Sequence, residues 1–104
     1  MATETNLDLV TLIIQHKDEG KVVDAILKAG APGATYFYGR GTGVRQRLGI
    51  LGRMIEAEKI IFLIALKPEQ TQAVVKAATE AAKLEEPGNG FLCVQHAAQV
   101  VGFF

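Results

Sequence analysis

The stretch KIIFLIALKPEQTQAVVKAA, residues 59–78, joins an apolar segment directly to a segment with helical periodicity. Residues 59–66 are almost all aliphatic or aromatic, which is typical of a strand that is buried on both faces. Pro68 follows, and proline is favoured in the first turn of a helix because no backbone N–H is needed there. Apolar residues then recur on one helical face, at Val74, Val75, Ala78 and Ala82. We expect a strand over 59–66 and a helix from 67 to about 84.

The residues before this stretch predict a strand, a helix and a second strand. LVTLIIQ, residues 9–15, is rich in β-branched residues and indicates a buried strand. Residues 21–29 indicate a helix, which Asp18 could cap at its start and Gly30 ends. Its apolar face contains Val22, Val23, Ile26 and Leu27. ATYFY, residues 34–38, carries aromatic residues and a threonine and indicates the second strand.

The residues after this stretch complete the pattern. The turn EEPGNG, residues 85–90, leads into FLCVQ, residues 91–95, which indicates a fourth strand. Residues 1–6 are polar and are expected to fray, while 96–104 are ambiguous. The order β-α-β-β-α-β predicts an α+β protein with the ferredoxin-like fold, in which two helices cover one face of an antiparallel sheet.

One such domain accounts for all 104 residues. The two helices cover only one face of the sheet, whereas the strand at 59–66 is apolar on both sides. We therefore expect another copy of the chain to cover the second face. The apolar fraction of 49% is high for a small monomer and supports this expectation.

Charge and cysteine content exclude several classes of function. Lys plus Arg and Asp plus Glu both number 11, so the chain has no long-range attraction for nucleic acid. The single cysteine, Cys93, excludes an intrachain disulfide, and its apolar neighbours predict a buried thiol. The first residues do not form a signal peptide, and the longest apolar run, 60–66, is far shorter than the ~20 residues of a membrane span. We expect a cytoplasmic protein.

Residues 39–58 form a long segment between the second and third predicted strands, with five glycines and four arginines. Segments of this length are usually functional. Backbone N–H groups of a glycine-rich turn can bind an anion, and arginine binds phosphate in a bidentate manner. The alternatives are a hinge for the glycines and a solvated loop for the arginines. The candidate ligand-binding residues here are Gly39, Arg40, Gly41, Thr42, Gly43, Arg45 and Gln46.

The second half of this segment combines arginines with exposed apolar residues, which are unfavourable in water unless something covers them. They could form a short helix that docks on a partner, or they could fold back on the chain's own assembly. The candidate docking residues are Arg47, Leu48, Ile50, Leu51, Arg53 and Met54.

The turn at 85–90 is the other candidate binding element. Gly88, Asn89 and Gly90 could contact phosphate, or they could simply form a tight turn. His16 and His96 are too few for a metal site and are expected to be ordinary core or surface residues. No pattern of nucleophile and base is visible, so we expect no enzyme, although weak nucleotide hydrolysis stays open.

In combination these pieces resemble the P-II signal-transduction proteins (nitrogen regulatory protein P-II). The resemblance covers roughly residues 8–101. It rests on LVTLIIQHKDEGKVVDAILKAGAPGAT (9–35), YGRGTG (38–43), KIIFLIALKPEQTQAVVKAA (59–78) and GNGFLCV (88–94). The resemblance implies that 39–58 is the T-loop of the family and 85–90 its B-loop.

The resemblance also implies a homotrimer that binds an adenine nucleotide between subunits and controls a partner through the T-loop. A membrane transporter or an enzyme would be the partner, and a transporter would recruit the protein to the membrane. Asn89 and Phe91 replace the aspartate and lysine that are usual in the B-loop, and QVVGFF (99–104) carries no basic residue. AMP, ADP or a cyclic mononucleotide is therefore expected in preference to ATP. No prosthetic group is expected, and a role for Mg²⁺ is open.

Two other functional classes fit the same architecture. A trimeric metal-binding or metal-tolerance protein would bind metal without nucleotide, although the arginine-containing T-loop argues against it. A weak nucleotide hydrolase would need a positioned water and a metal. The sequence does not identify the effector or the partner. Whether 2-oxoglutarate or bicarbonate is sensed is also open.

Overall fold

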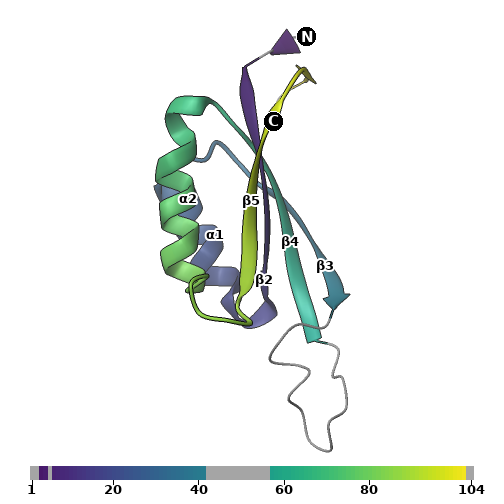
Figure 1. Cartoon of the computed structure of the whole chain (residues 1–104), viewed down its shortest axis with the longest axis vertical. Helices are drawn as coiled ribbons and strands as arrows, with labels where there is room; N and C mark the ends of the chain where they lie inside the picture. Colours follow the sequence, from purple (N-terminus) through teal and green to yellow (C-terminus); the bar gives the residue numbers. More distant parts are fainter. Residues whose placement is uncertain (1–2, 5, 42–56, 103–104) are drawn as a thin grey trace, which may run out of the picture.

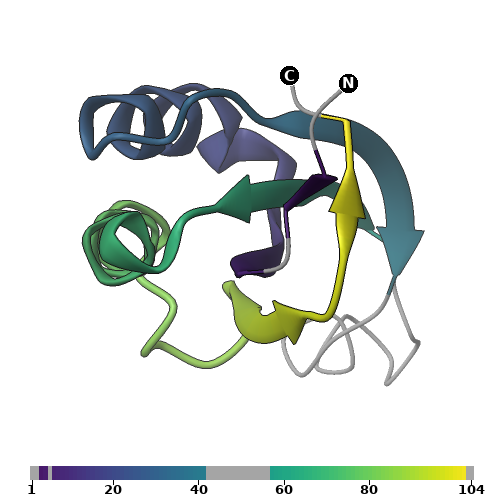
Figure 2. The same cartoon turned by 90° about the horizontal axis from the view of Figure 1, so that it is seen from above.

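The computed structural model describes residues 3–4, 6–41 and 57–102. Its elements are, in order, β1 (Thr3–Glu4), β2 (Leu7–Gln15), the 3₁₀ turn η1 (His16–Asp18), α1 (Glu19–Lys28), β3 (Thr35–Gly41), β4 (Ala57–Leu66), α2 (Pro68–Ala82), β5 (Gly90–Ala97) and β6 (Val100–Val101). Four strands form an antiparallel sheet in the order β3-β4-β2-β5, and both helices cover the same face of it (Figures 1 and 2). The predicted α+β, ferredoxin-like fold is confirmed.

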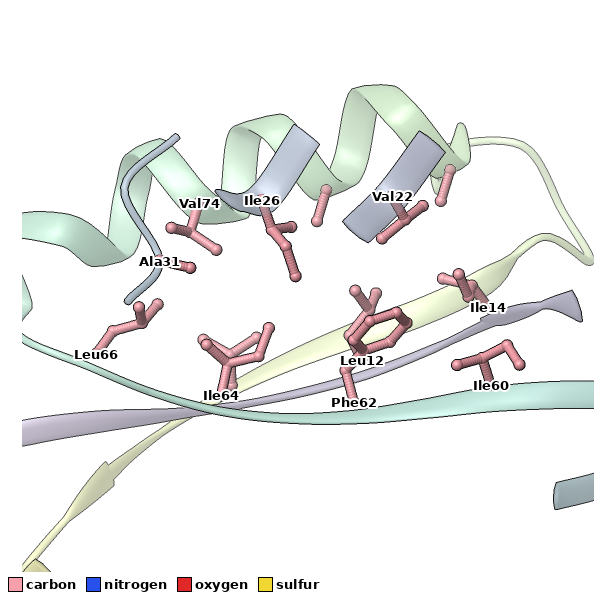
Figure 3. Close-up of a cluster of buried hydrophobic side chains, with 13 residues drawn as sticks. Leu12, Ile14, Val22, Ile26, Ala31, Ile60, Phe62, Ile64, Leu66 and Val74 are labelled. Carbon is pink, nitrogen blue, oxygen red and sulfur yellow. The ribbon is translucent and has the colours of Figure 1, made fainter. Parts of the chain in front are cut away.

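The core lies between this sheet and the two helices (Figure 3). Alternate residues of the central strands point toward the helices, because side chains alternate between the faces of a strand. These sheet residues, all with at most 1% exposure, are Val10, Leu12, Ile14, Ile60, Phe62, Ile64 and Leu66. They pack against Val22 and Ile26 of α1 and Val74 and Ala78 of α2. Burying a side chain of this kind contributes about 1.5–3 kcal/mol to folding, so this layer is the main stabilising element.

The first helix differs in detail from its prediction. It begins at Glu19 rather than Lys21, and Leu27 is 47% exposed rather than part of the buried face. Asp18 occupies the position before the helix but makes no capping hydrogen bond with its side chain. Its buried carboxylate instead lies 3.1 Å from the Lys21 ammonium. The end of the helix is as predicted, with Gly30 in the left-handed region at φ +111°.

The face of the sheet away from the helices carries a row of apolar residues. Phe37, Ile61, Ile13 and Phe91 lie opposite one another across all four strands. Phe37 is 49% exposed and Phe91 54% exposed. Cys93 lies on the same face, opposite Thr11, and is exposed. The prediction that Cys93 is buried is therefore wrong for the single chain, because this face has no helix over it.

The strands next to the predicted T-loop are longer than expected. Residues 39–41 continue β3, and residues 57 and 58 begin β4, so both ends of the predicted loop 39–58 are paired backbone. Arg40 lies opposite Glu58, so the ladder places opposite charges together at this position. We call residues 39–41 and 57–59 the stem. Residues 42–56 lie outside the described residues.

The two ends of the chain also form more structure than predicted. Residues 3–4, expected to fray, pair with residues 100–101 as a small two-stranded sheet. β2 starts at Leu7, which is 1% exposed, and β5 continues to Ala97. α2 ends at Ala82, close to the predicted end at about 84. Within the described part of the chain, no helix combines the length and the apolar character needed to cross a bilayer.

Candidate functional site

The stem and the B-loop lie at the same end of the sheet. β3 ends there at Gly41, β4 begins at Ala57, β2 ends at Gln15 and β5 begins at Gly90 (Figure 1). This arrangement follows from the antiparallel order of the strands, because each neighbour runs in the opposite direction. Two glycine-containing segments that are far apart in the sequence are thereby placed at the same end of the sheet, at its two outer strands, β3 and β5.

A chain of hydrogen bonds connects the two segments. The Lys59 ammonium donates to Gln15 Oε1 at 3.3 Å, and Gln15 Nε2 donates to the carbonyl oxygen of Gly88 at 2.6 Å. Lys59 lies opposite both Gly39 and Gln15 in the sheet, on the face away from the helices. Partial burial lowers the pKa of Lys59, because a desolvated ammonium is less stable than a hydrated one.

Sequence reasoning missed Lys59 and Gln15. Each was assigned only to the end of a strand. A signal was present, however, because residues 61, 63 and 65 share the face of residue 59 and are all apolar. A lysine in register with such a face is partly desolvated, and this makes it a candidate for anion binding.

The B-loop is shaped by its own backbone. Gly88 has φ +87° and Gly90 has φ +131°, both in the region that favours glycine. A Cβ atom on Gly90 would collide with the carbonyl oxygen of Ile13. Gly90 is therefore required by the close packing of β5 on β2, whatever else it contacts.

Asn89, predicted to bind ligand, faces back into the turn. The residue is 5% exposed, and its amide donates to the carbonyl oxygen of Lys83 at 3.0 Å and to Glu86 Oε2 at 3.2 Å. Its Oδ1 has no hydrogen-bond partner among the described residues. In the single chain the side chain of Asn89 thus stabilises the turn after α2, and its role toward a ligand stays a prediction.

Arg40 lies at the same end but on the other face of the sheet. Because side chains alternate, Arg40 shares a face with Tyr38, whereas Gly39 shares a face with Lys59. Arg40, Tyr38, Gly39, His16 and Glu58 line a hollow of about 420 Å³. The structure therefore places Gly39–Gly41 and Gly88–Gly90 at the same end of the sheet, but on opposite sides of the two central strands. It places Arg40 on the other face from the hydrogen-bonded Lys59 and Gln15.

The remaining predicted positions cannot be placed. Those expected to bind ligand that lie outside the described residues are Thr42, Gly43, Arg45 and Gln46. The predicted docking residues outside them are Arg47, Leu48, Ile50, Leu51, Arg53 and Met54.

A second hollow lies at the opposite end of β3. It has a volume of about 570 Å³ and no charged residue in its lining. The residues around it are Pro32, Gly33, Ala34, Thr35, Leu63, Ala65, Val100, Val101 and Gly102. Such an apolar surface can hold a flat hydrophobic group, whereas the stem end can hold an anion.

The His, Cys, Asp and Glu side chains of the described residues are not arranged for metal binding or for nucleophilic catalysis. No group of three or more His, Cys, Asp or Glu side chains in them is placed to hold a metal ion. His96 Nδ1 lies 3.5 Å from Asp8 Oδ1, and the Thr71 hydroxyl donates to Asp8 Oδ2 at 2.7 Å. The Asp8 carboxylate lies between the His96 imidazole and the Thr71 hydroxyl, so the imidazole is not beside the hydroxyl. Thr71 is also only 2% exposed, so its hydroxyl is not available as a nucleophile.

Comparisons with known proteins agree with this architecture. The family model described as Nitrogen regulatory protein P-II matches residues 7–102. A crystal structure of Arabidopsis thaliana PII bound to citrate is similar, with a TM-score of 0.70 and 24% sequence identity over 91% of this chain and 80% of that chain. At this identity the likeness shows the fold alone. No curated protein matches the sequence.

Proposed function

The chain belongs to the nitrogen regulatory protein P-II family, whose members are regulatory proteins, and we propose that it senses a small anionic effector. The effector is an adenine nucleotide, with AMP, ADP or a cyclic mononucleotide favoured over ATP. It binds in the cleft between the subunits of a homotrimer. Binding alters the T-loop, residues 39–58, and so controls a partner such as a membrane transporter.

The observation that carries this proposal is the position of Lys59. Its ammonium is partly buried, and its hydrogen-bond partner among the described residues is the neutral amide of Gln15. Desolvation disfavours a charged group unless an opposite charge compensates for it. A phosphate beside Lys59 would provide this charge and would also reach the backbone of the B-loop, to which Gln15 is bonded.

The trimer is supported by the apolar row on the free face of the sheet. Phe37 and Phe91 are each about half exposed at the two edges of that row, with Ile61 and Ile13 between them. A continuous apolar face of this kind is typical of a protein–protein interface. Identical copies that cover it for one another form a closed, symmetric assembly.

A nucleotide that binds at the stem needs a place for its base, and the apolar hollow at Thr35 provides one. Within one chain, the hollow and the stem are separated by the length of β3, from Thr35 to Gly41. At about 3.3 Å per residue this is roughly 20 Å, which is too far for one mononucleotide to bridge. We therefore place the base against the hollow of a neighbouring subunit, which makes the site incomplete in a single chain.

Two further observations bear on the choice of effector. The stretch 99–104 has no basic residue, so fewer phosphate charges can be neutralised there. The Arabidopsis thaliana protein of similar fold is bound to citrate, which is a small anion without a base. The binding test therefore also has to include carboxylate anions.

Calorimetric titration of the purified protein with AMP, ADP, ATP, cyclic AMP, 2-oxoglutarate, bicarbonate and citrate tests the proposal. We expect AMP or ADP to bind most tightly, and Lys59→Met to weaken that binding about tenfold. Lys76→Met, on the exposed side of α2, is the matched control and should leave the affinity unchanged. Binding that is unaffected by Lys59→Met, or no binding of any of these anions, would contradict the proposal.

The oligomeric state is tested separately by light scattering after size-exclusion chromatography and by the reactivity of Cys93. In a trimer that covers the free face, the thiol should react with a disulfide reagent much more slowly in the native protein than in denaturant. A monomer with a rapidly reacting thiol would exclude this assembly.

Control of a partner is tested with membrane vesicles that contain a candidate transporter, compared with vesicles that contain none. We expect the protein to sediment with them, and the bound fraction to change when AMP or ADP is added. Replacing Arg47 and Arg53 by alanine should reduce sedimentation without changing nucleotide affinity. If the bound fraction is equal with and without nucleotide, then the effector does not control binding to the partner, and this part of the proposal is wrong.

A further inference from the structure

His16 contacts residues of three different elements at the helix-side face of the stem. Its Nε2 lies 4.0 Å from Glu19 Oε1 and 3.9 Å from Glu58 Oε2. Its ring lies against that of Tyr38, with centroids 5.5 Å apart. Glu19 begins α1, Tyr38 belongs to β3 and Glu58 to β4. A single imidazole thus connects the helix layer with both strands of the stem.

The charges around His16 make its protonation state important. The two carboxylates face it from α1 and β4, while β3 contributes Tyr38 and Arg40 to the same hollow. In its own turn, the Lys17 ammonium lies 3.7 Å from the Asp18 carboxylate, which also pairs with Lys21. Asp18 is therefore paired twice within η1 and α1, and these three groups together carry a net charge of about +1.

Tyr38 contributes a neutral hydrogen bond to this cluster. Its hydroxyl donates to Glu19 Oε1 at 3.2 Å. The negative charge of Glu19, followed by the hydrogen bond to it, raises the pKa of Tyr38, so the hydroxyl stays protonated throughout the neutral range. Among the residue types in this cluster, histidine is the one whose charge can change within the neutral range.

We propose that His16 is a proton-operated clamp on the stem. When His16 is protonated, its positive charge pairs with Glu19 and Glu58 and holds the start of β4 and the end of β3 against α1. When it is neutral, both pairings lose their ionic component and the stem opens more readily. The clamp itself requires no effector; only its consequence, a pH-dependent T-loop response, rests on the proposed function.

The expected effect is modest because the side chains are exposed, with 51% exposure for His16 and 63% for Glu58. Exposed ion pairs are weak, because water screens the two charges from each other. The local opening of the stem should therefore change about two- to fivefold between the two protonation states. Raised salt should reduce the difference, since it screens exposed charges.

Hydrogen exchange of the full-length protein without nucleotide tests the clamp. Exchange of the amides around Arg40 and Glu58 is measured at pH 5.5 and pH 7.5, and wild type is compared with His16→Gln at each pH. This comparison cancels the intrinsic pH dependence of exchange. We expect the wild type to exchange about two- to fivefold more slowly than the variant at pH 5.5, and at the same rate at pH 7.5.

Two further variants keep the test decisive. Glu58→Gln, a change at an exposed side chain, should lose part of the low-pH protection even if His16→Gln folds poorly. His96→Gln replaces the other exposed histidine, which lies in β5 opposite Asp8, and should change nothing at the stem. An equal wild-type to His16→Gln ratio at both pH values would overturn the clamp. Effector titrations on the same samples would show separately whether the proposed sensor function fails.

Discussion

The two glycine-containing segments at the end of the sheet look alike in sequence but differ in what the fold requires of them. In the B-loop, Gly90 has φ +131° and no room for a Cβ atom, because the backbone of Ile13 occupies that space. In the stem, a Cβ atom on Gly41 would meet no atom of the described residues within 4 Å, and the φ angle of Gly41 lies outside the left-handed region. The fold thus explains the glycine at 90, but it leaves the glycine at 41 to be explained by binding or by motion.

The largest effect is expected for Gly90→Ala. The added methyl group collides with the Ile13 carbonyl, and alanine disfavours this backbone conformation. We expect a loss of at least about 3 kcal/mol in the free energy of unfolding, measured by denaturant titration. A stability close to wild type would mean that β5 can shift relative to β2, and that the B-loop is less constrained than its geometry indicates.

Asn89→Ala should have the next largest effect. It removes the two hydrogen bonds that the amide donates inside the turn, to Lys83 and Glu86. Leaving the Lys83 carbonyl without this donor should reduce the free energy of unfolding by about 1–2 kcal/mol. If the variant is as stable as wild type but loses nucleotide affinity, then Asn89 acts on the ligand as the sequence predicted, and not on the turn.

Lys59→Met should change stability in the opposite direction to its effect on binding. Burial lowers the pKa of Lys59 from 10.5, so the unfolded chain holds this proton more tightly than the folded chain. Because of this difference, the stability of wild type should rise with pH as it approaches 10.5 from below. At pH 7 the variant should be more stable than wild type by up to about 0.5 kcal/mol, and the gap should narrow as pH rises. A variant that is less stable at pH 7 would show that Lys59 is already compensated in the free protein.

The smallest change in stability is expected for Gly41→Ala, the counterpart of Gly90→Ala. Since the added methyl group meets no atom of the described residues, the free energy of unfolding should stay within about 0.5 kcal/mol of wild type. Calorimetry on the same variant then separates the two interpretations of the stem glycines. Weaker nucleotide binding would support close ligand approach, whereas unchanged binding with altered partner sedimentation would support a hinge.

Much of the fold could be predicted because it depends on local periodicity. The apolar segment at 59–66 and the helix that follows Pro68 are both present, and the order of the elements is as expected. Boundaries were less predictable. Glycines are poor strand formers, so 39–41 were assigned to a loop, yet the ladder with 57–59 holds them in β3. Helix faces were predicted in part, with Val22 and Ile26 buried but Leu27 exposed.

The candidate site was less predictable than the fold. Gly88 and Gly90 were identified from turn chemistry, and the stem glycines from their spacing. The apolar residues at 61, 63 and 65 indicate that Lys59 is partly desolvated, but nothing local indicated that Gln15 connects it with Gly88. The face on which Arg40 lies depends on the pairing register of β3. A slip of one residue in this register would move every side chain of the strand to the other face of the sheet. Sequence alone gives no such register.

By itself the sequence determined the order of strands and helices, the apolar character of both sheet faces and membership in a family, because these depend on the periodicity and composition of adjacent residues. Only the tertiary structure decided which groups meet. The bonds from Lys59 to Gln15 and from Gln15 to Gly88 join residues 44 and 73 positions apart. They form because antiparallel strands bring distant segments to the same end of the sheet. The partial burial of the Lys59 ammonium depends on this arrangement of strands and not on any one segment of the sequence.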